Sequence, residues 1–279
     1  MADKNVIEAI KALRERTGAG MMDCKHALEE NGFDIEKSVD WLREKGIAKA
    51  AKRANRTAAE GLAAVMTCDK CGHGAIVEVN CETDFVSGSD KFHEFANGAV
   101  EYVLKNDPKT FEEAEAGIKQ LKDDTALATG EKLVFRRYAV LTKTEEQGFG
   151  SYIHMGGKIG VLLVLAKKDD EFAGQLAMHI AANAPEFITL ADVPASIRER
   201  EKGVATAEVA ADPKLINKPE QVKAQIIERK VDKVLSQSCL DFQKWLLDDQ
   251  KTVGQVLKEK GNGVVSFIRY QVGEGIAAA

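Results

Sequence analysis

The densest group of metal-binding side chains lies in one predicted turn, which contains Cys68, Cys71 and His73. Thiolate sulfur and imidazole nitrogen bind structural zinc, and a Cys-x-x-Cys pair supplies half of a zinc knuckle. Cys81 would be a fourth ligand if the following strand returned it to the same end, and a nearby acid or base would then indicate a metal-dependent enzyme. A complete site of this type has two such pairs, however, and this sequence has one. We therefore expect no metal and interpret the pair as two thiols in a turn.

His154 is the other candidate for chemistry, because it ends a predicted strand just before Gly156 and Gly157. A catalytic histidine works beside a Ser or Cys nucleophile and an acid that orients it. No such partners are evident near His154, so a hydrogen-bonded turn residue is the simpler interpretation. Phosphate-binding loops are also missing, since the sequence contains neither Gly-Lys-Ser nor Gly-Lys-Thr. We expect no cofactor and no bond chemistry of the chain's own.

A site for binding rather than catalysis is predicted where a strand meets a helix. We name residues 83–86 the corner segment, which consists of Thr83, Asp84, Phe85 and Val86. The β-branched residues 75–79 predict a strand before it, and apolar residues at helical spacing predict a helix after it, with Asp90 as the expected N-cap. A corner on a rigid scaffold is a usual place for residues that contact partners. The alternative is that Phe85 and Val86 fold back into the core.

Composition limits the class of protein. The 279 residues allow two compact units, and the formal charge of −5 gives no electrostatic footprint for nucleic acid. No apolar run approaches the roughly 18 residues of a membrane span, and the start of the chain has no hydrophobic signal region. The five cysteines are scattered and odd in number, which argues against a disulfide framework. We expect a cytoplasmic protein without a membrane or nucleic-acid partner.

Residues 1–46 predict a bundle of three short helices. Glycine-containing stops at residues 17–20, Asn31-Gly32 and Gly46 separate the helices. The predicted inward faces are Val6, Ile7, Ile10 and Leu13, then Met22, Ala27 and Leu28, then Ile35, Val39 and Leu42. A bundle of about 45 residues has the size of ubiquitin-associated (UBA-like) modules, which are docking domains. A self-sufficient binding module of that kind is an alternative function.

The rest of the chain predicts an α+β fold. A strand hairpin followed by a helix is expected near residues 61–104 and again near 148–183, which indicates a core of two α+β halves with antiparallel sheets. Two amphipathic helices lie between the second of these halves and the closing strand, and they indicate an inserted helical hairpin. The predicted parts are 1–46, a UBA-like domain; 47–60, a basic linker; 61–141, a core N-subdomain; 142–195 with 239–279, a core C-subdomain; and 196–238, a protruding helical hairpin.

The linker at residues 47–60 is rich in Ala, Lys and Arg. Its cations lie three or four residues apart and are Lys49, Lys52, Arg53 and Arg56. The pattern allows a basic helical arm or a solvated tether, and the tether is the commoner of the two.

Two long motifs resemble signatures of the elongation factor Ts family, the bacterial guanine nucleotide exchange factors. The first covers residues 13–25, LRERTGAGMMDCK, and the second covers residues 78–86, EVNCETDFV. Further matches lie at residues 150–154, 158–161, 177–182, 252–257 and 267–275. They follow the family order over nearly the whole chain, which is thereby identified as a member.

The resemblance implies a partner, elongation factor Tu, in its GDP-bound and nucleotide-free forms. In the family a Thr-Asp-Phe-Val corner inserts against the nucleotide domain of the partner and dislodges the Mg²⁺ beside GDP. The matching residues here are Thr83, Asp84, Phe85 and Val86. Burial of one Phe contributes roughly 1.5–3 kcal/mol, so further contacts must contribute to the effect.

Those further contacts are also implied by the resemblance. Arg14, Met21 and Met22 correspond to the docking residues of the bundle, and His154 corresponds to a second contact surface on the core. Adjacent methionines suit an adaptable surface, while core filling is the alternative for one of them. The hairpin at residues 196–238 is a dimerisation element in some relatives, which makes a homodimer a further expectation.

Overall fold

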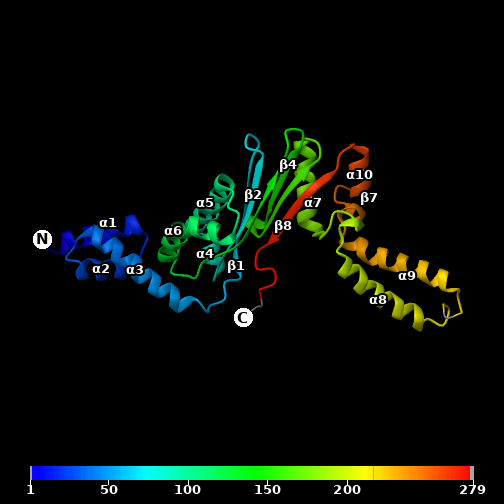
Figure 1. The fold of residues 1–279 in the computed structure, drawn as a ribbon. Helices are drawn as coiled ribbons and strands as arrows, with labels where there is room; N and C mark the ends of the chain where they lie inside the picture. The colour runs from blue at the N-terminus through cyan, green and yellow to red at the C-terminus, as the bar shows by residue number, and fades with distance from the viewer. Residues whose placement is uncertain (1, 216, 277–279) are drawn as a thin grey trace. The chain divides into compact units, whose positions relative to one another are not determined.

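A computed structural model describes residues 2–215 and 217–276 of the chain (Figure 1). The side chains of residues 2–5 and 47–52 lie outside this description, and with them those of Lys49 and Lys52 in the predicted linker. The chain forms two compact units. The first comprises the described residues of Met1–Thr144, Ser151–Leu162 and Ile268–Ala279, and the second comprises Glu145–Gly150 and Leu163–Phe267.

After an all-helical start, the chain combines antiparallel strands with groups of helices, so the predicted α+β class is confirmed. The helices are α1 (Ala2–Thr17), α2 (Met21–Glu30), α3 (Ile35–Arg53), α4 (Asp84–Ser87), α5 (Asp90–Asn106), α6 (Phe111–Thr129), α7 (Asp170–Asn183), α8 (Ala195–Ala211), α9 (Glu220–Leu235) and α10 (Val253–Glu259). The strands are β1 (Glu60–Cys68), β2 (His73–Cys81), β3 (Val134–Thr142), β4 (Gly148–His154), β5 (Ile159–Leu165), β6 (Lys244–Trp245), β7 (Asp248–Thr252) and β8 (Val264–Gln271). The sheet orders are β1-β2-β3, β4-β5-β8 and β6-β7.

Helices α1 to α3 form the predicted bundle, with two corrections to its faces. Its core contains Leu13, Leu28 and Leu42, whereas Ile7 and Met22, both predicted to face inward, are exposed. An apolar residue at the right spacing still faces water when no neighbouring helix covers it.

The third helix is longer than predicted. Gly46 was expected to end it, but α3 continues to Arg53. Gly46 faces Leu127 of α6, which packs on the core of the bundle. A tertiary contact thus outweighs the weak helix propensity of glycine.

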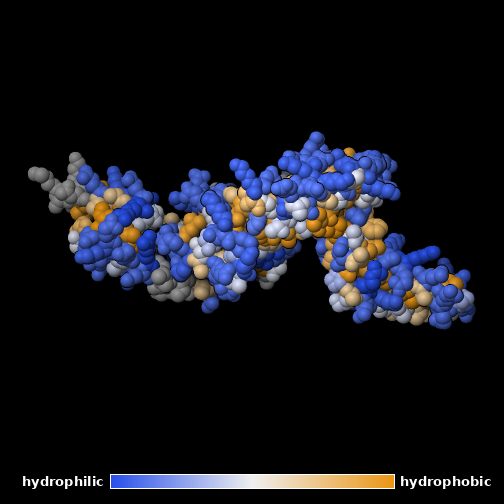
Figure 2. All heavy atoms as spheres, turned by 45° about the horizontal axis from the view of Figure 1, so that its top comes forward, coloured by the Kyte–Doolittle hydropathy of each residue, from blue (hydrophilic) through white to orange (hydrophobic). Residues whose placement is uncertain are grey.

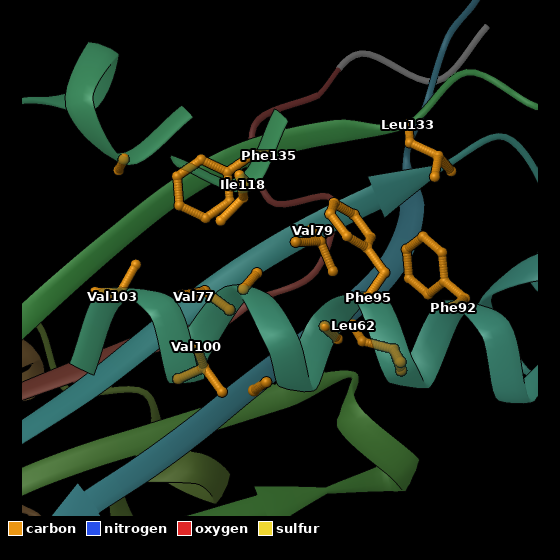
Figure 3. Close-up of a cluster of buried hydrophobic side chains, with 14 of the residues drawn as sticks. Leu62, Val77, Val79, Phe92, Phe95, Val100, Val103, Ile118, Leu133 and Phe135 are labelled. Carbon is orange, nitrogen blue, oxygen red and sulfur yellow. The ribbon is translucent and has the colours of Figure 1, made fainter. Parts of the chain in front are cut away.

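The core of the first unit lies between α5 and the sheet β1-β2-β3. Strand β2 is central and antiparallel to both neighbours. Figure 3 shows the α5 side chains Phe92, Phe95, Val100 and Val103 directed toward Leu62, Val77 and Val79 of the strands. The phenylalanine rings meet edge to face, with centroids 5.8 Å apart. The helical spacing in α5 and the alternation in β2 therefore bury one common apolar layer.

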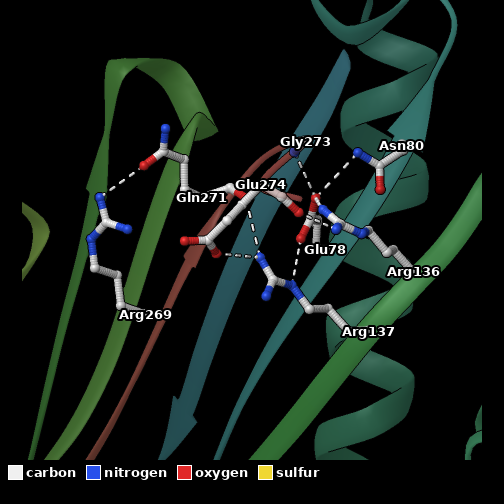
Figure 4. Close-up of polar contacts among 8 residues, drawn as sticks. All are labelled: Glu78, Asn80, Arg136, Arg137, Arg269, Gln271, Gly273 and Glu274. Carbon is white, nitrogen blue, oxygen red and sulfur yellow. Dashed lines mark hydrogen bonds and ion pairs between the residues drawn. The ribbon is translucent and has the colours of Figure 1, made fainter. Parts of the chain in front are cut away.

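The opposite face of β2 buries a carboxylate. The Glu78 side chain is fully buried and accepts hydrogen bonds from Arg136 Nη1 at 2.7 Å and Arg137 Nε at 2.6 Å. A third donor is the backbone N–H of Gly273, at 2.9 Å (Figure 4). Glu78 therefore ties the residues after β8 to the first sheet.

A β-bulge allows two consecutive arginines to reach one carboxylate. Glu78 pairs with Arg137, but Val79 pairs with Phe135, so Arg136 is an extra residue in β3. In a regular strand neighbouring side chains point to opposite faces, and one arginine would face away. No local pattern in the sequence indicates that the two arginines share this partner.

The second unit contains a small hairpin that sequence analysis missed. Strand β6 has only two residues, and β7 has no apolar residue, so neither shows an alternating pattern. Trp245 of β6 is buried, and its ring stacks on His179 of α7 at a centroid distance of 5.3 Å.

In the same unit, α8 and α9 form the predicted helical hairpin, whose surface in Figure 2 is mainly hydrophilic with scattered hydrophobic residues.

Replacement of a core phenylalanine should destabilise the first unit strongly. We expect Phe95→Ala to lower the free energy of unfolding by about 3–5 kcal/mol, because it leaves a cavity between α5 and the sheet. Urea unfolding followed by circular dichroism measures the change. Phe85→Ala is the matched control, and its expected effect is below about 0.5 kcal/mol because that ring is exposed. Equal losses in the two variants would contradict the description of the core.

The Glu78 network should make stability depend on pH. Burial acts to raise the pKa of Glu78, but the hydrogen bonds from Gly273, Arg136 and Arg137 outweigh it and leave the pKa below its ordinary value. A lowered pKa stabilises the fold above the unfolded value of about 4.3, and this contribution is lost as the pH falls through the lower folded value. We expect Glu78→Gln to cost about 3 kcal/mol at neutral pH, since it removes the buried counter-charge that Arg136 and Arg137 share and leaves Arg137 with its ion pair to the exposed Glu274.

The measurement is urea unfolding of the wild type and of Glu78→Gln over a pH series from neutral to acid. The difference between the two proteins should narrow in the acid range. A difference that stays constant down to the lowest pH would show that the Glu78 charge contributes nothing.

Candidate functional site

The corner segment forms a helical turn between β2 and α5. Thr83 is the N-cap of α4, and its hydroxyl accepts a hydrogen bond from the backbone N–H of Val86 at 3.3 Å. Helix α5 then begins at Asp90 with Ser89, not Asp90, as its N-cap; the Ser89 hydroxyl accepts from the N–H of Phe92 at 3.3 Å. The expected Asp90 cap is therefore wrong, because the serine one residue earlier is placed to bond the third helical N–H.

The two apolar residues of the corner segment face opposite ways. Phe85 is 86% exposed, the highest value for a large apolar side chain among the residues that the structure describes. Val86 is half-buried and packs against the core under α5. The alternative that both residues fold into the core is wrong for Phe85. Successive helical residues point about 100° apart, so one turn can present one side chain and bury the next.

Glu131, in the loop after α6, holds the backbone that leads into this turn. Its Oε2 accepts hydrogen bonds from the N–H groups of Glu82 and Thr83 at 2.9 and 3.1 Å. Its Oε1 accepts from the Thr83 hydroxyl at 2.6 Å. In return, Glu82 accepts from the N–H of Lys132 at 2.7 Å. Each segment thus accepts hydrogen bonds from the other through a carboxylate. Glu131 could not be predicted from the sequence, because no local pattern marks it.

The bundle residues implied by the resemblance are on the surface. Arg14 is exposed near the end of α1. Met21 and Met22 begin α2 and are 58% and 72% exposed, so the core-filling alternative is wrong for both. The side chains of α2 that do enter the core are Cys24, Ala27 and Leu28.

His154 ends β4 in an exposed turn. Its Nδ1 lies 3.2 Å from the Tyr152 hydroxyl, and the two rings stack at 5.8 Å. The next residue, Met155, is 70% exposed and has a left-handed backbone with φ +50°. A shallow groove of about 310 Å³ lies beside this turn, lined in part by Ile153, Gly156 and residues of β1 and α5. The corner segment, the start of α2 and this turn lie on separate elements.

The strand register excludes Cys81 as the fourth ligand of a zinc site in the turn. Cys68 pairs with His73 at one end of the β1-β2 hairpin, whereas Cys81 pairs with Glu60 at the other end. Cys81 therefore cannot complete a site in the turn, and burial raises the pKa of its thiol to about 12. Within residues 2–215 and 217–276, no group of three or more His, Cys, Asp or Glu side chains is placed to hold a metal ion.

None of the helices in the described part of the chain is both long enough and apolar enough to cross a bilayer.

Comparison with known proteins agrees with the motifs. The family model for elongation factor TS matches residues 82–274. Elongation factor Ts of Lactiplantibacillus plantarum is 43% identical over 273 residues, which cover 96% of this chain and 91% of that protein. The family model begins inside the second motif and includes the whole corner segment, and the alignment with the relative covers nearly the whole chain. Members of the family are exchange factors rather than enzymes. The chain therefore belongs to the elongation factor Ts family, the guanine nucleotide exchange factors of elongation factor Tu.

Proposed function

We propose that the corner segment is the part of the chain that loosens GDP on elongation factor Tu. Phe85 presses against the loops of the GTPase that hold Mg²⁺, while Thr83, Asp84 and Val86 line the same contact. The observation that carries the proposal is the 86% exposure of Phe85 on a short, well-held turn. An apolar ring in that position gains free energy when a partner covers it.

The magnitude of this gain suits an exchange factor. Burial of one Phe contributes about 1.5–3 kcal/mol, which shifts an equilibrium by about 10- to 150-fold. Mg²⁺ requires near-octahedral ligands at about 2.0–2.1 Å, so a small displacement of its loops weakens its binding and that of GDP. Because coupling is reciprocal, GDP weakens binding of this chain by the same factor, and rebinding of GTP releases it.

The rigidity of the turn supports the proposal further. The three hydrogen bonds to Glu131 order the backbone of Glu82 and Thr83 before any partner arrives. A segment that is already ordered loses less conformational entropy on binding, so more of the Phe85 burial energy is available to move the partner's loops. Glu131 is therefore a positioning residue that acts through the corner segment.

One ring supplies only part of the affinity, and we assign the rest to two other surfaces. Arg14, Met21 and Met22 dock the bundle onto the GTPase, and His154 contributes from the core. Exposed adjacent methionines support the first surface, because their flexible thioethers adapt to a partner. An exposed histidine between Ile153 and Met155, which are exposed as well, supports the second.

Self-association is a separate proposal. The hairpin at residues 196–238 pairs two copies of the chain, and its support is a set of exposed apolar side chains: Val204, Val222 and Val234. The domain boundaries predicted from the sequence also stay a prediction, with residues 1–46 as the docking domain.

Removal of the exposed ring should slow nucleotide exchange without unfolding the protein. We expect Phe85→Ala to reduce the rate of GDP release from elongation factor Tu by about tenfold or more, since it removes at least about 1.4 kcal/mol of contact energy. Release of a fluorescent GDP analogue measures the rate. Phe242→Ala, which truncates a 50% exposed phenylalanine ring in the second unit, is the control and should retain the wild-type rate. A wild-type rate for Phe85→Ala would remove the ring from the mechanism.

Loosening the turn should have a related effect while Phe85 stays in place. Glu131→Gln puts an amide N–H₂ where a carboxylate oxygen accepts hydrogen bonds, so at least one donor of Glu82 or Thr83 loses its partner. We expect GDP release to slow by about three- to tenfold, which corresponds to about 0.6–1.4 kcal/mol. Glu115→Gln, which removes a partly buried ion pair with Lys122 within α6, is the matched control. The idea fails if Glu131→Gln lowers stability but leaves the exchange rate unchanged.

A further inference from the structure

The five cysteines of the chain fall into two chemical classes. Cys24, Cys81 and Cys239 are each fully buried, and burial raises the pKa of all three thiols. Cys68, which ends β1, is partly exposed, and Cys71, in the turn between β1 and β2, is exposed. Thiol chemistry requires access and a thiolate. It is therefore confined to this one turn, which the exchange function does not use.

The two exposed cysteines contact each other's backbone. The N–H of Cys71 donates to Cys68 Sγ at 3.2 Å, and the Cys71 thiol donates to the carbonyl oxygen of Cys68 at 3.6 Å. Hydrogen bonds from the side chain and backbone of Cys71 lower the pKa of Cys68. Cys68 thus forms the thiolate more readily than Cys71, and the two residues are in contact.

The turn that carries the pair is anchored to the end of β3. Gly72 has φ +67°, and its carbonyl oxygen accepts from the N–H of Lys143 at 2.9 Å. A Cβ on Gly72 would lie only 2.9 Å from the carbonyl oxygen of Lys143, so glycine is needed here. The Lys143 ammonium also pairs with Asp69 at 3.2 Å. This anchoring holds the two thiols in proximity, which favours an intramolecular reaction between them.

We propose that Cys68 and Cys71 form a reversible dithiol–disulfide site that a low-molecular-weight disulfide such as oxidised glutathione closes. The Cys68 thiolate attacks one sulfur of the small disulfide, which releases one small thiol and leaves a mixed disulfide on Cys68. The Cys71 thiolate then attacks Cys68 Sγ, forms the protein disulfide and releases the second small thiol. The two protein thiols are oxidised by two electrons, the small disulfide is reduced, and the two cysteine protons end on the released thiols.

The site is independent of the proposed exchange mechanism. In the β1-β2 hairpin the turn lies at the Cys68–His73 end, and the corner segment follows the Glu60–Cys81 end. Ring closure joins residues that already share a turn, so it requires no change at the corner segment. Loss of the cysteines should therefore leave nucleotide exchange intact.

The test oxidises the full-length protein with excess oxidised glutathione and then blocks the remaining thiols with an alkylating agent. Trypsin cleaves after Lys70, between the two cysteines, so a Cys68–Cys71 disulfide joins two peptides that reduction separates. We expect this linked pair in the wild type, two fewer alkylated thiols per chain, and full reversal by dithiothreitol. The three buried cysteines should remain unmodified until the protein is denatured.

Single-thiol variants provide the control. Cys68→Ser and Cys71→Ser should each accept one glutathione and form no linked peptide, and both should keep the wild-type rate of GDP release. The proposal is overturned if the wild type gives only glutathione adducts, if both thiols stay free under oxidation, or if metal analysis shows the pair occupied by zinc shared between two chains.

Discussion

The hydrogen bonds between Glu131 and the start of the corner segment are the interaction on which the proposed function depends. A phenylalanine ring is usually most stable inside a protein, yet Phe85 is 86% exposed. The Phe85 ring stays exposed because residues other than Phe85 hold the turn in place. Glu131 binds the backbone of Glu82 and Thr83, and Val86 packs into the core one residue beyond the ring. Within one helical turn, Phe85 is therefore exposed to a partner and Val86 packs into the core.

Strand β2 extends this rigidity into the core. One of its faces packs on α5, and the other buries Glu78 between two arginines and the backbone of Gly273. A buried carboxylate is stable only with such partners, and the bulge at Arg136 supplies the second of them. The corner segment therefore follows a strand that is held on both faces. The contacts on both faces of β2 therefore resist displacement of the corner segment when a partner presses on Phe85.

Most elements could be predicted from local pattern, and the exceptions share a cause. The hairpin β1-β2 and helix α5 have clear periods and were predicted from them. Helix α4 has four residues and strand β6 has two, which is too short for any period. The extension of α3 past Gly46 depends on Leu127, a residue of another helix. Pattern fails where an element is hardly longer than one repeat or is completed by a distant contact.

The sequence by itself determined the family, the GTPase partner and the α+β class, because long motifs and apolar periods are local properties of the chain. It also placed the corner segment at the end of a strand. Only the tertiary structure decided that Phe85 faces water while Val86 enters the core, and that Cys81 lies at the far end of its hairpin from Cys68. These outcomes depend on contacts between residues far apart in sequence, such as Glu82 with Glu131, 49 positions away. Such contacts arise from packing of whole elements, and no local run of residues encodes them.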